Sequence, residues 1–167
     1  RPKTLVTAPP AVLPRSSGGA TLLLWPTSGH LVTQYYSGRH SGLDIDGDYD
    51  SPIYASEDGV VVRSGWTTSG YGNYVVIDHG GNVCSRYAHL EDDSITVYKG
   101  EEVCQGLVIG KIGDTGNAYG SHLHFQFEDC RTGASIEKAF SDGNGVPECT
   151  MGEDLYDRDG DYDFLVL

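Results

Sequence analysis

The residues with the clearest chemical potential in this sequence are its histidines. Two of the six lie two residues apart in the stretch His122–Glu128, which alternates polar and apolar residues. Strand side chains alternate between the two faces of a sheet, so His122 and His124 are expected on one face, ~6–7 Å apart. Two imidazoles at that spacing can share a reaction centre, one binding a metal and the other serving the substrate. Coincidence is the alternative for this motif when it is taken alone.

Two further patterns carry metal-binding or proton-transfer groups. His40 and Asp44 are four residues apart with Gly42 between them, so both can converge from a turn onto one ion. Neutral imidazole and carboxylate are both good zinc ligands. His89 ends a strand-like run as part of Tyr87-Ala88-His89, and as an isolated strand histidine it would more often be structural. We expect the two histidines outside these patterns, His30 and His79, to be ordinary surface residues.

Four alternating carboxylates lie close to the C-terminus, with Gly160 available for a tight turn. Such a cluster repels itself unless a cation or water screens it, and calcium tolerates six to eight oxygen ligands in irregular geometry. A calcium site and a solvated acidic tail therefore both remain open. The residues concerned are Asp157, Asp159, Asp161 and Asp163.

The four cysteines are Cys84, Cys104, Cys130 and Cys149. No two form a CxxC pair, which argues against a structural zinc site, and an even count fits two disulfides in an oxidising compartment. Three pairings are possible. We expect neighbours in sequence to pair, as Cys84–Cys104 and Cys130–Cys149, the alternative being four reduced, buried cysteines.

The elements that must position these groups are short strands. Strand-like runs alternate with turn signals such as Gly80-Gly81-Asn82, and only Ser135–Phe140 looks helical. We therefore predict an all-β fold of antiparallel sheets with little helix. The predicted organisation is an extended Pro/Gly/Ser-rich tail at 1–20, a main domain at 21–130 and an acidic extension packed on it at 131–167. The predicted strands are Gly59–Trp66, Tyr74–His79, Val83–Leu90, Leu107–Ile112 and His122–Glu128.

Charge and hydrophobicity exclude two classes of partner. The formal net charge of −13 argues against nucleic acid, because phosphate binding needs a basic face. No apolar run approaches the ~20 residues that span a bilayer. The chain starts with neither Met nor a signal-like segment, so we expect a mature or trimmed form.

Taken together, the three histidine patterns resemble one family. HSGLD at 40–44, YAH at 87–89 and HLH at 122–124 occur in the order typical of LytM/lysostaphin-type zinc metallopeptidases. The connecting segments SPIYASEDGVV at 51–61, GYGNYVVIDHG at 70–80 and TGNAYGSHLHF at 115–125 are similar as well. The resemblance covers roughly residues 25–128.

The resemblance implies a site and an activity. His40, Asp44 and His124 match the family's zinc ligands, and His89 and His122 match its two catalytic histidines, of which either can be the general base. The implied protein is a monomeric, secreted or cell-envelope zinc endopeptidase, with a groove that accepts peptidoglycan peptides. Glycine cross-bridges and stem-peptide links both remain open as substrates. A catalytically silent peptidoglycan-binding or activator module on the same fold is the alternative.

Three residues just before the zinc motif are candidates for contact with the substrate, because tyrosine and arginine suit a peptide or a glycan. They are Tyr35, Tyr36 and Arg39.

Overall fold

The computed structural model describes residues 22–29, 31–136 and 164–166, which form eleven strands and no helix. The predicted all-β class is confirmed, as are the predicted strands to within two residues at each end. The strands are β1 (Leu22–Leu24), β2 (Val32–Gln34), β3 (Leu43–Asp46), β4 (Pro52–Tyr54), β5 (Gly59–Thr67), β6 (Gly72–Asp78), β7 (Val83–Leu90), β8 (Glu102–Val103), β9 (Val108–Lys111), β10 (His122–Asp129) and β11 (Phe164–Val166).

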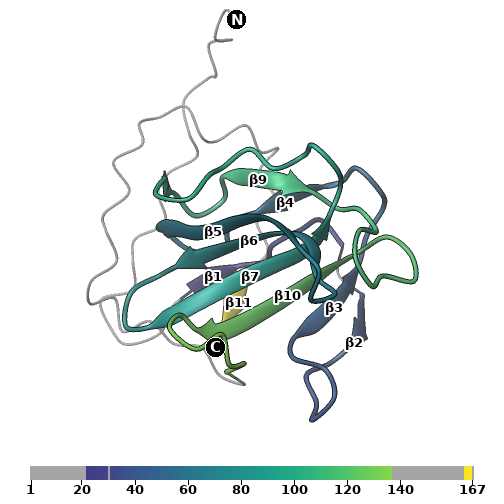
Figure 1. Ribbon diagram of the computed structural model, residues 1–167, viewed down its shortest axis with the longest axis horizontal. Helices are drawn as coiled ribbons and strands as arrows, with labels where there is room; N and C mark the ends of the chain where they lie inside the picture. Colours follow the sequence, from purple (N-terminus) through teal and green to yellow (C-terminus); the bar gives the residue numbers. More distant parts are fainter. Residues whose placement is uncertain (1–21, 30, 137–163, 167) are drawn as a thin grey trace, which may run out of the picture.

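A seven-stranded antiparallel sheet dominates the structure (Figure 1). Its strand order is β2-β3-β10-β7-β6-β5-β8. The run β5-β6-β7 follows the chain, and the turn at Gly80-Gly81-Asn82 joins β6 to β7 as predicted. Strand β10 instead inserts between β3 and β7, which are far from it in sequence. This insertion brings the three histidine motifs to adjacent strands.

Two small antiparallel sheets complete the described part of the chain. Strand β4 pairs with β9, and β1 pairs with β11, so the start and the end of the described chain lie side by side. The isoleucines Ile53 of β4 and Ile109 of β9 are fully buried in the same core as residues of the large sheet. The β4–β9 pair therefore covers one face of that sheet and leaves the other face for the polar residues.

Alternation along β10 divides the large sheet into an apolar face and a polar face. Leu123 and Phe125 are buried in the core with Ile45 of β3 and Tyr87 of β7. The intervening residues of β10 are polar and occupy the opposite face, as their spacing predicts.

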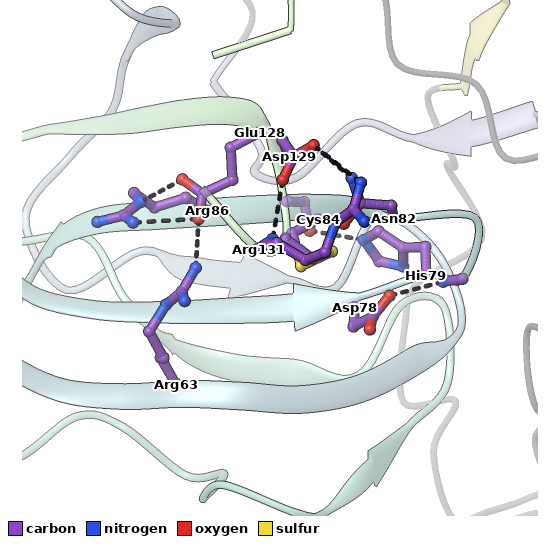
Figure 2. Close-up of a disulfide and its surroundings, with 12 residues drawn as sticks. Arg63, Asp78, His79, Asn82, Cys84, Arg86, Glu128, Asp129 and Arg131 are labelled. Carbon is purple, nitrogen blue, oxygen red and sulfur yellow. Dashed lines mark hydrogen bonds and ion pairs between the residues drawn. A yellow bond between two sulfur atoms is a disulfide. The ribbon is translucent and has the colours of Figure 1, made fainter. Parts of the chain in front are cut away.

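The predicted cysteine pairing is wrong, because Cys84 on β7 forms a disulfide with Cys130, just after β10 (Figure 2). The Cα atoms are 5.1 Å apart across the two neighbouring strands. Cys104 is not free either, and Cys149 lies outside the described residues. Nearness in sequence failed as a guide because the 46-residue separation is closed by strand pairing.

The prediction that His79 is a surface residue is also wrong. Its side chain is 2% exposed; Nδ1 donates to the Asp58 carbonyl at 2.8 Å and Nε2 contacts the Ser85 hydroxyl at 2.7 Å. Burial lowers the pKa of His79, so the imidazole is neutral inside the protein. The chain turns inward at this point to enter the β6–β7 hairpin, which a local pattern does not reveal.

Several sequence predictions fall on residues that the structure does not describe. They include His30, most of the predicted helix Ser135–Phe140 and the acidic cluster proposed for calcium, so those predictions stay untested. Ser135 itself forms a β-bridge with Glu128. Within the described residues, no helix is long and apolar enough to cross a bilayer.

Candidate active site

The first two candidate ligands are His40, in the turn before β3, and Asp44, on β3. A tight turn closed by two backbone hydrogen bonds between Ser37 and His40 leads the chain into the strand. Gly42 then passes so close to β10 that an added β-carbon would lie 2.4 Å from the Phe125 carbonyl oxygen. Only glycine fits such an approach, and this is what allows His40 and Asp44 to face β10.

The third candidate ligand comes from β10. His124 is directly opposite Asp44 in the β3–β10 register. Its Nδ1 lies 2.9 Å from Asp44 Oδ1, and Nε2 of His40 lies 3.0 Å from the same oxygen. One ligand atom from each of the three residues falls within 4.8 Å of the others. Two imidazoles and one carboxylate at this spacing fit zinc, with a fourth position left for water or substrate.

His89 reaches the same site from the end of β7 through an unusual backbone conformation. Its φ is +64°, in the left-handed region that non-glycine residues rarely adopt. Its Nδ1 donates to the Thr115 carbonyl at 2.7 Å, and its ring centroid lies 4.7 Å from that of His122. A backbone held in this way directs the imidazole toward β10 instead of along the alternation of its own strand.

His122 is held by a similar contact. Its Nδ1 donates to the Gly120 carbonyl at 2.9 Å, and its Nε2 lies 3.7 Å from Asp44 Oδ2. In both His89 and His122 a backbone carbonyl therefore fixes the proton on Nδ1. Nε2 is left in each ring as the nitrogen that can accept or return a proton.

Burial and neighbouring imidazoles shift two of the pKa values in the site. Burial lowers the pKa of His89 to about 4, and the nearby rings of His122 and His124 add to this, so His89 is neutral at pH 7. Burial alone would raise the pKa of Asp44. The hydrogen bond from His124 and the attraction of the surrounding imidazoles outweigh it and lower the Asp44 pKa below its usual value, which keeps the carboxylate ionised.

Sequence reasoning missed several residues that support His124. The Gln126 Oε1 atom lies 3.1 Å from His124 Nε2 and accepts from the Ser41 hydroxyl at 2.7 Å and from the Tyr71 hydroxyl at 3.1 Å. The polar–apolar alternation along β10 did predict that Gln126 lies on the same face as His124, so the sequence held a signal for this contact. Nothing in the local sequence indicated Tyr71, which comes from the β5–β6 hairpin.

The aromatic residues before β3 are exposed, as a substrate-contacting role requires. Tyr35 is 68% exposed and Tyr36 is 41% exposed, and Arg39 lies on the surface beside them. Tyr35 also contacts the site through its backbone, because His40 Nδ1 lies 3.2 Å from its carbonyl oxygen. That contact leaves His40 Nε2 to face Asp44.

Comparison with known protein families agrees with this geometry. The model of peptidase family M23 matches residues 38–137, which include all three histidine motifs. The chain belongs to peptidase family M23. The resemblance to LytM/lysostaphin-type peptidases is thereby confirmed.

Two curated M23 relatives differ in what their names describe. Peptidoglycan DD-endopeptidase ShyA of Vibrio cholerae is 44% identical over 102 residues, covering 60% of this chain and 23% of ShyA. Murein hydrolase activator NlpD of Salmonella dublin is 34% identical over 127 residues, covering 75% of this chain and 33% of NlpD. The chain thus spans less than two thirds of the length of the curated relatives that it matches first.

Solved structures of M23 peptidases share the fold. The catalytic domain of lysostaphin from Staphylococcus simulans matches with a TM-score of 0.52 and 28% identity, covering 71% of this chain and 81% of that domain. A zinc-containing peptidase from Vibrio cholerae matches with a TM-score of 0.53 and 31% identity, covering 71% of this chain and 37% of that structure.

Proposed function

We propose that this M23 chain is a zinc-dependent endopeptidase that hydrolyses peptide bonds in bacterial peptidoglycan. The observation that carries the proposal is the convergence of His40, Asp44 and His124 within 4.8 Å, beside two further histidines. A module that only binds would not need His89 and His122 oriented toward that cluster. We also propose a main domain at 21–130, which the M23 match at 38–137 largely overlaps.

The proposed mechanism assigns metal binding to three residues and proton transfer to two. His40, Asp44 and His124 would hold the zinc ion, which would supply an acidified water, with a pKa of about 7, and Lewis-acid polarisation of the scissile carbonyl. His122, whose Nε2 lies 3.7 Å from Asp44 Oδ2, is placed to take the proton of the attacking water and return it to the leaving amine. His89 is neutral at physiological pH with Nε2 unprotonated, so it is placed to exchange roles with His122 as the proton acceptor, and it can donate to the developing oxyanion only after Nε2 has taken up a proton.

The names of the relatives support a proposal for the substrate and the location. ShyA is named for peptidoglycan DD-endopeptidase activity, and other relatives are named as lipoproteins. We therefore propose a peptidoglycan peptide as substrate and a secreted or cell-envelope location, with the protein acting as a monomer. Stem-peptide links and glycine bridges both remain open as the bond that is cleaved, and hydrolysis of each should be assayed.

The second candidate function is that of a catalytically silent activator, which the similarity to NlpD favours. An activator would stimulate a separate hydrolase without cleaving peptidoglycan itself. The complete set of ligand and proton-transfer residues supports the enzyme instead. An assay on purified peptidoglycan, with no other hydrolase present, separates the two functions.

The test combines metal content with turnover. We expect one zinc per chain in the wild type, loss of zinc and activity together in His124→Ala, and retained zinc with ~10²–10⁴-fold lower turnover in His122→Ala. Asp44→Asn and Asp46→Asn form a matched pair on β3, of which only the first is expected to lose zinc. Tight zinc binding by the wild type without cleavage of any cross-link would refute the endopeptidase and favour the activator.

A further inference from the structure

A buried polar row on β10 links the proposed metal centre to two arginines. His124, Gln126 and Glu128 share one face of the strand and are 4%, 2% and 0% exposed. Burying a polar group costs free energy unless it has a hydrogen-bond partner, so each residue of this row is expected to have one.

The far end of the row is an ion pair cluster. The Glu128 carboxylate accepts from Arg63 Nη2 at 2.7 Å, from Arg86 Nε at 2.7 Å and from Arg86 Nη2 at 3.1 Å (Figure 2). A buried carboxylate is stable when paired and hydrogen-bonded in this way. Paired with two guanidinium groups, the Glu128 carboxylate presents only acceptor oxygens to its other neighbours.

This fixed acceptor determines which way the Gln126 amide points. Its NH₂ group donates to Glu128 Oε2 at 3.1 Å, because an oxygen turned toward that carboxylate would leave two acceptors facing each other. Oε1 therefore faces the other way, toward His124 and the hydroxyls of Ser41 and Tyr71. Arg86 supports the same arrangement by stacking 4.4 Å over the Tyr71 ring.

We propose that Gln126 is a positioning residue that fixes the ligating nitrogen of His124, an inference that rests on the proposed zinc site. Because Oε1 is an acceptor, His124 Nε2 must carry the proton that bridges them. When zinc is bound and no proton lies between Nδ1 and Asp44, the lone pair of Nδ1 is then the one that faces the metal position. Partners of this kind orient metal-bound histidines and set which nitrogen binds. Here a neutral amide does so, and the negative charge sits one step further away, on Glu128.

The experiment measures zinc affinity by competition with a chromophoric chelator. Gln126→Leu removes the acceptor and is expected to weaken zinc binding about 10–100-fold. Gln126→Glu keeps an acceptor beside His124 and is expected to retain affinity within a few-fold, although its contact with Glu128 lowers thermal stability. The matched control is Gln105→Leu, whose partly buried amide donates to the Ser56 carbonyl at 2.9 Å, away from the metal position. Wild-type zinc affinity in Gln126→Leu would overturn the inference.

A second measurement needs no variant, which matters because Gln126→Leu can fail to fold. Nitrogen-15 NMR of the zinc-loaded wild type is expected to show His124 with a metal-bound Nδ1 and a protonated, slowly exchanging Nε2. Metal bound to His124 Nε2 would overturn the role of Gln126 while leaving the zinc site intact. A wild type that binds no zinc would instead refute the proposed function, and the positioning role with it.

Discussion

Replacing Gly42 with alanine tests whether the approach of the β3 turn to β10 positions the metal ligands. The new β-carbon would lie 2.4 Å from the Phe125 carbonyl oxygen, against about 3.4 Å for an ordinary contact, so one segment must move by about 1 Å. Its other near neighbours are Gln126 Cα and Cβ, at 3.1 and 2.9 Å, so no side-chain rotation relieves the contact. The movement separates His40 and Asp44 from His124.

A displacement of this size has predictable consequences. Misplacing a catalytic group by 1 Å costs ~10²-fold in rate, and overpacking costs ~1–3 kcal/mol of stability. For a chain of this length, each kcal/mol lowers the melting temperature by about 2–4 °C. We expect Gly42→Ala to show weaker zinc binding, ~10²-fold lower kcat/KM on peptidoglycan fragments and a lower melting temperature.

The control for this prediction is another glycine in the same turn. Gly38 is exposed, and an added β-carbon there would meet nothing within 4 Å. Gly38→Ala is therefore expected to match the wild type in zinc affinity, turnover and melting temperature. Equal zinc affinity and stability in Gly42→Ala and Gly38→Ala would refute the argument that close approach at β10 sets the geometry.

Three further predictions concern the scaffold. Replacing both Cys84 and Cys130 with serine is expected to lower the free energy of unfolding by ~2–4 kcal/mol in urea titrations, and no loss would mean that the disulfide adds nothing to strand pairing. Burial lowers the pKa of His79 below its value in the unfolded chain, which is near 6.5. The free energy of unfolding is therefore expected to be largest above pH 6.5 and to decrease as the pH falls below that value. His79→Gln should flatten that dependence in pH-resolved melts, and an unchanged slope would contradict the assignment. Tyr87→Phe leaves the Ser56 amide without its 2.8 Å acceptor and should lower the unfolding free energy by ~1–3 kcal/mol; wild-type stability would argue against it.

The sequence was informative where function depends on local alternation. The period of two along His122–Glu128 predicted both the apolar face and the row that holds His124 and Gln126. Strand bounds such as Val83–Leu90 followed from the same pattern and from turn residues, and the structure confirms them.

The remaining features depend on which strands become neighbours. Cys84 pairs with Cys130 only because β10 lies beside β7, and no local pattern encodes that adjacency. His79 is buried with partners from two other segments, Asp58 before β5 and Ser85 on β7. The residues around His124 include Tyr71 and Ser41, which come from two further segments of the chain, so residue types alone could not assemble them.

The position of β10 in the sheet has a consequence for the order in which activity can arise. A growing chain that ends before residue 124 contains only two of the three proposed ligands. It also lacks most of β10, so β3 and β7 are still without this common partner. Such non-local pairings form late, because the loops that join them must close first. Incomplete or partly folded chains thus lack the complete set of proposed ligands, which comes together only in the finished sheet.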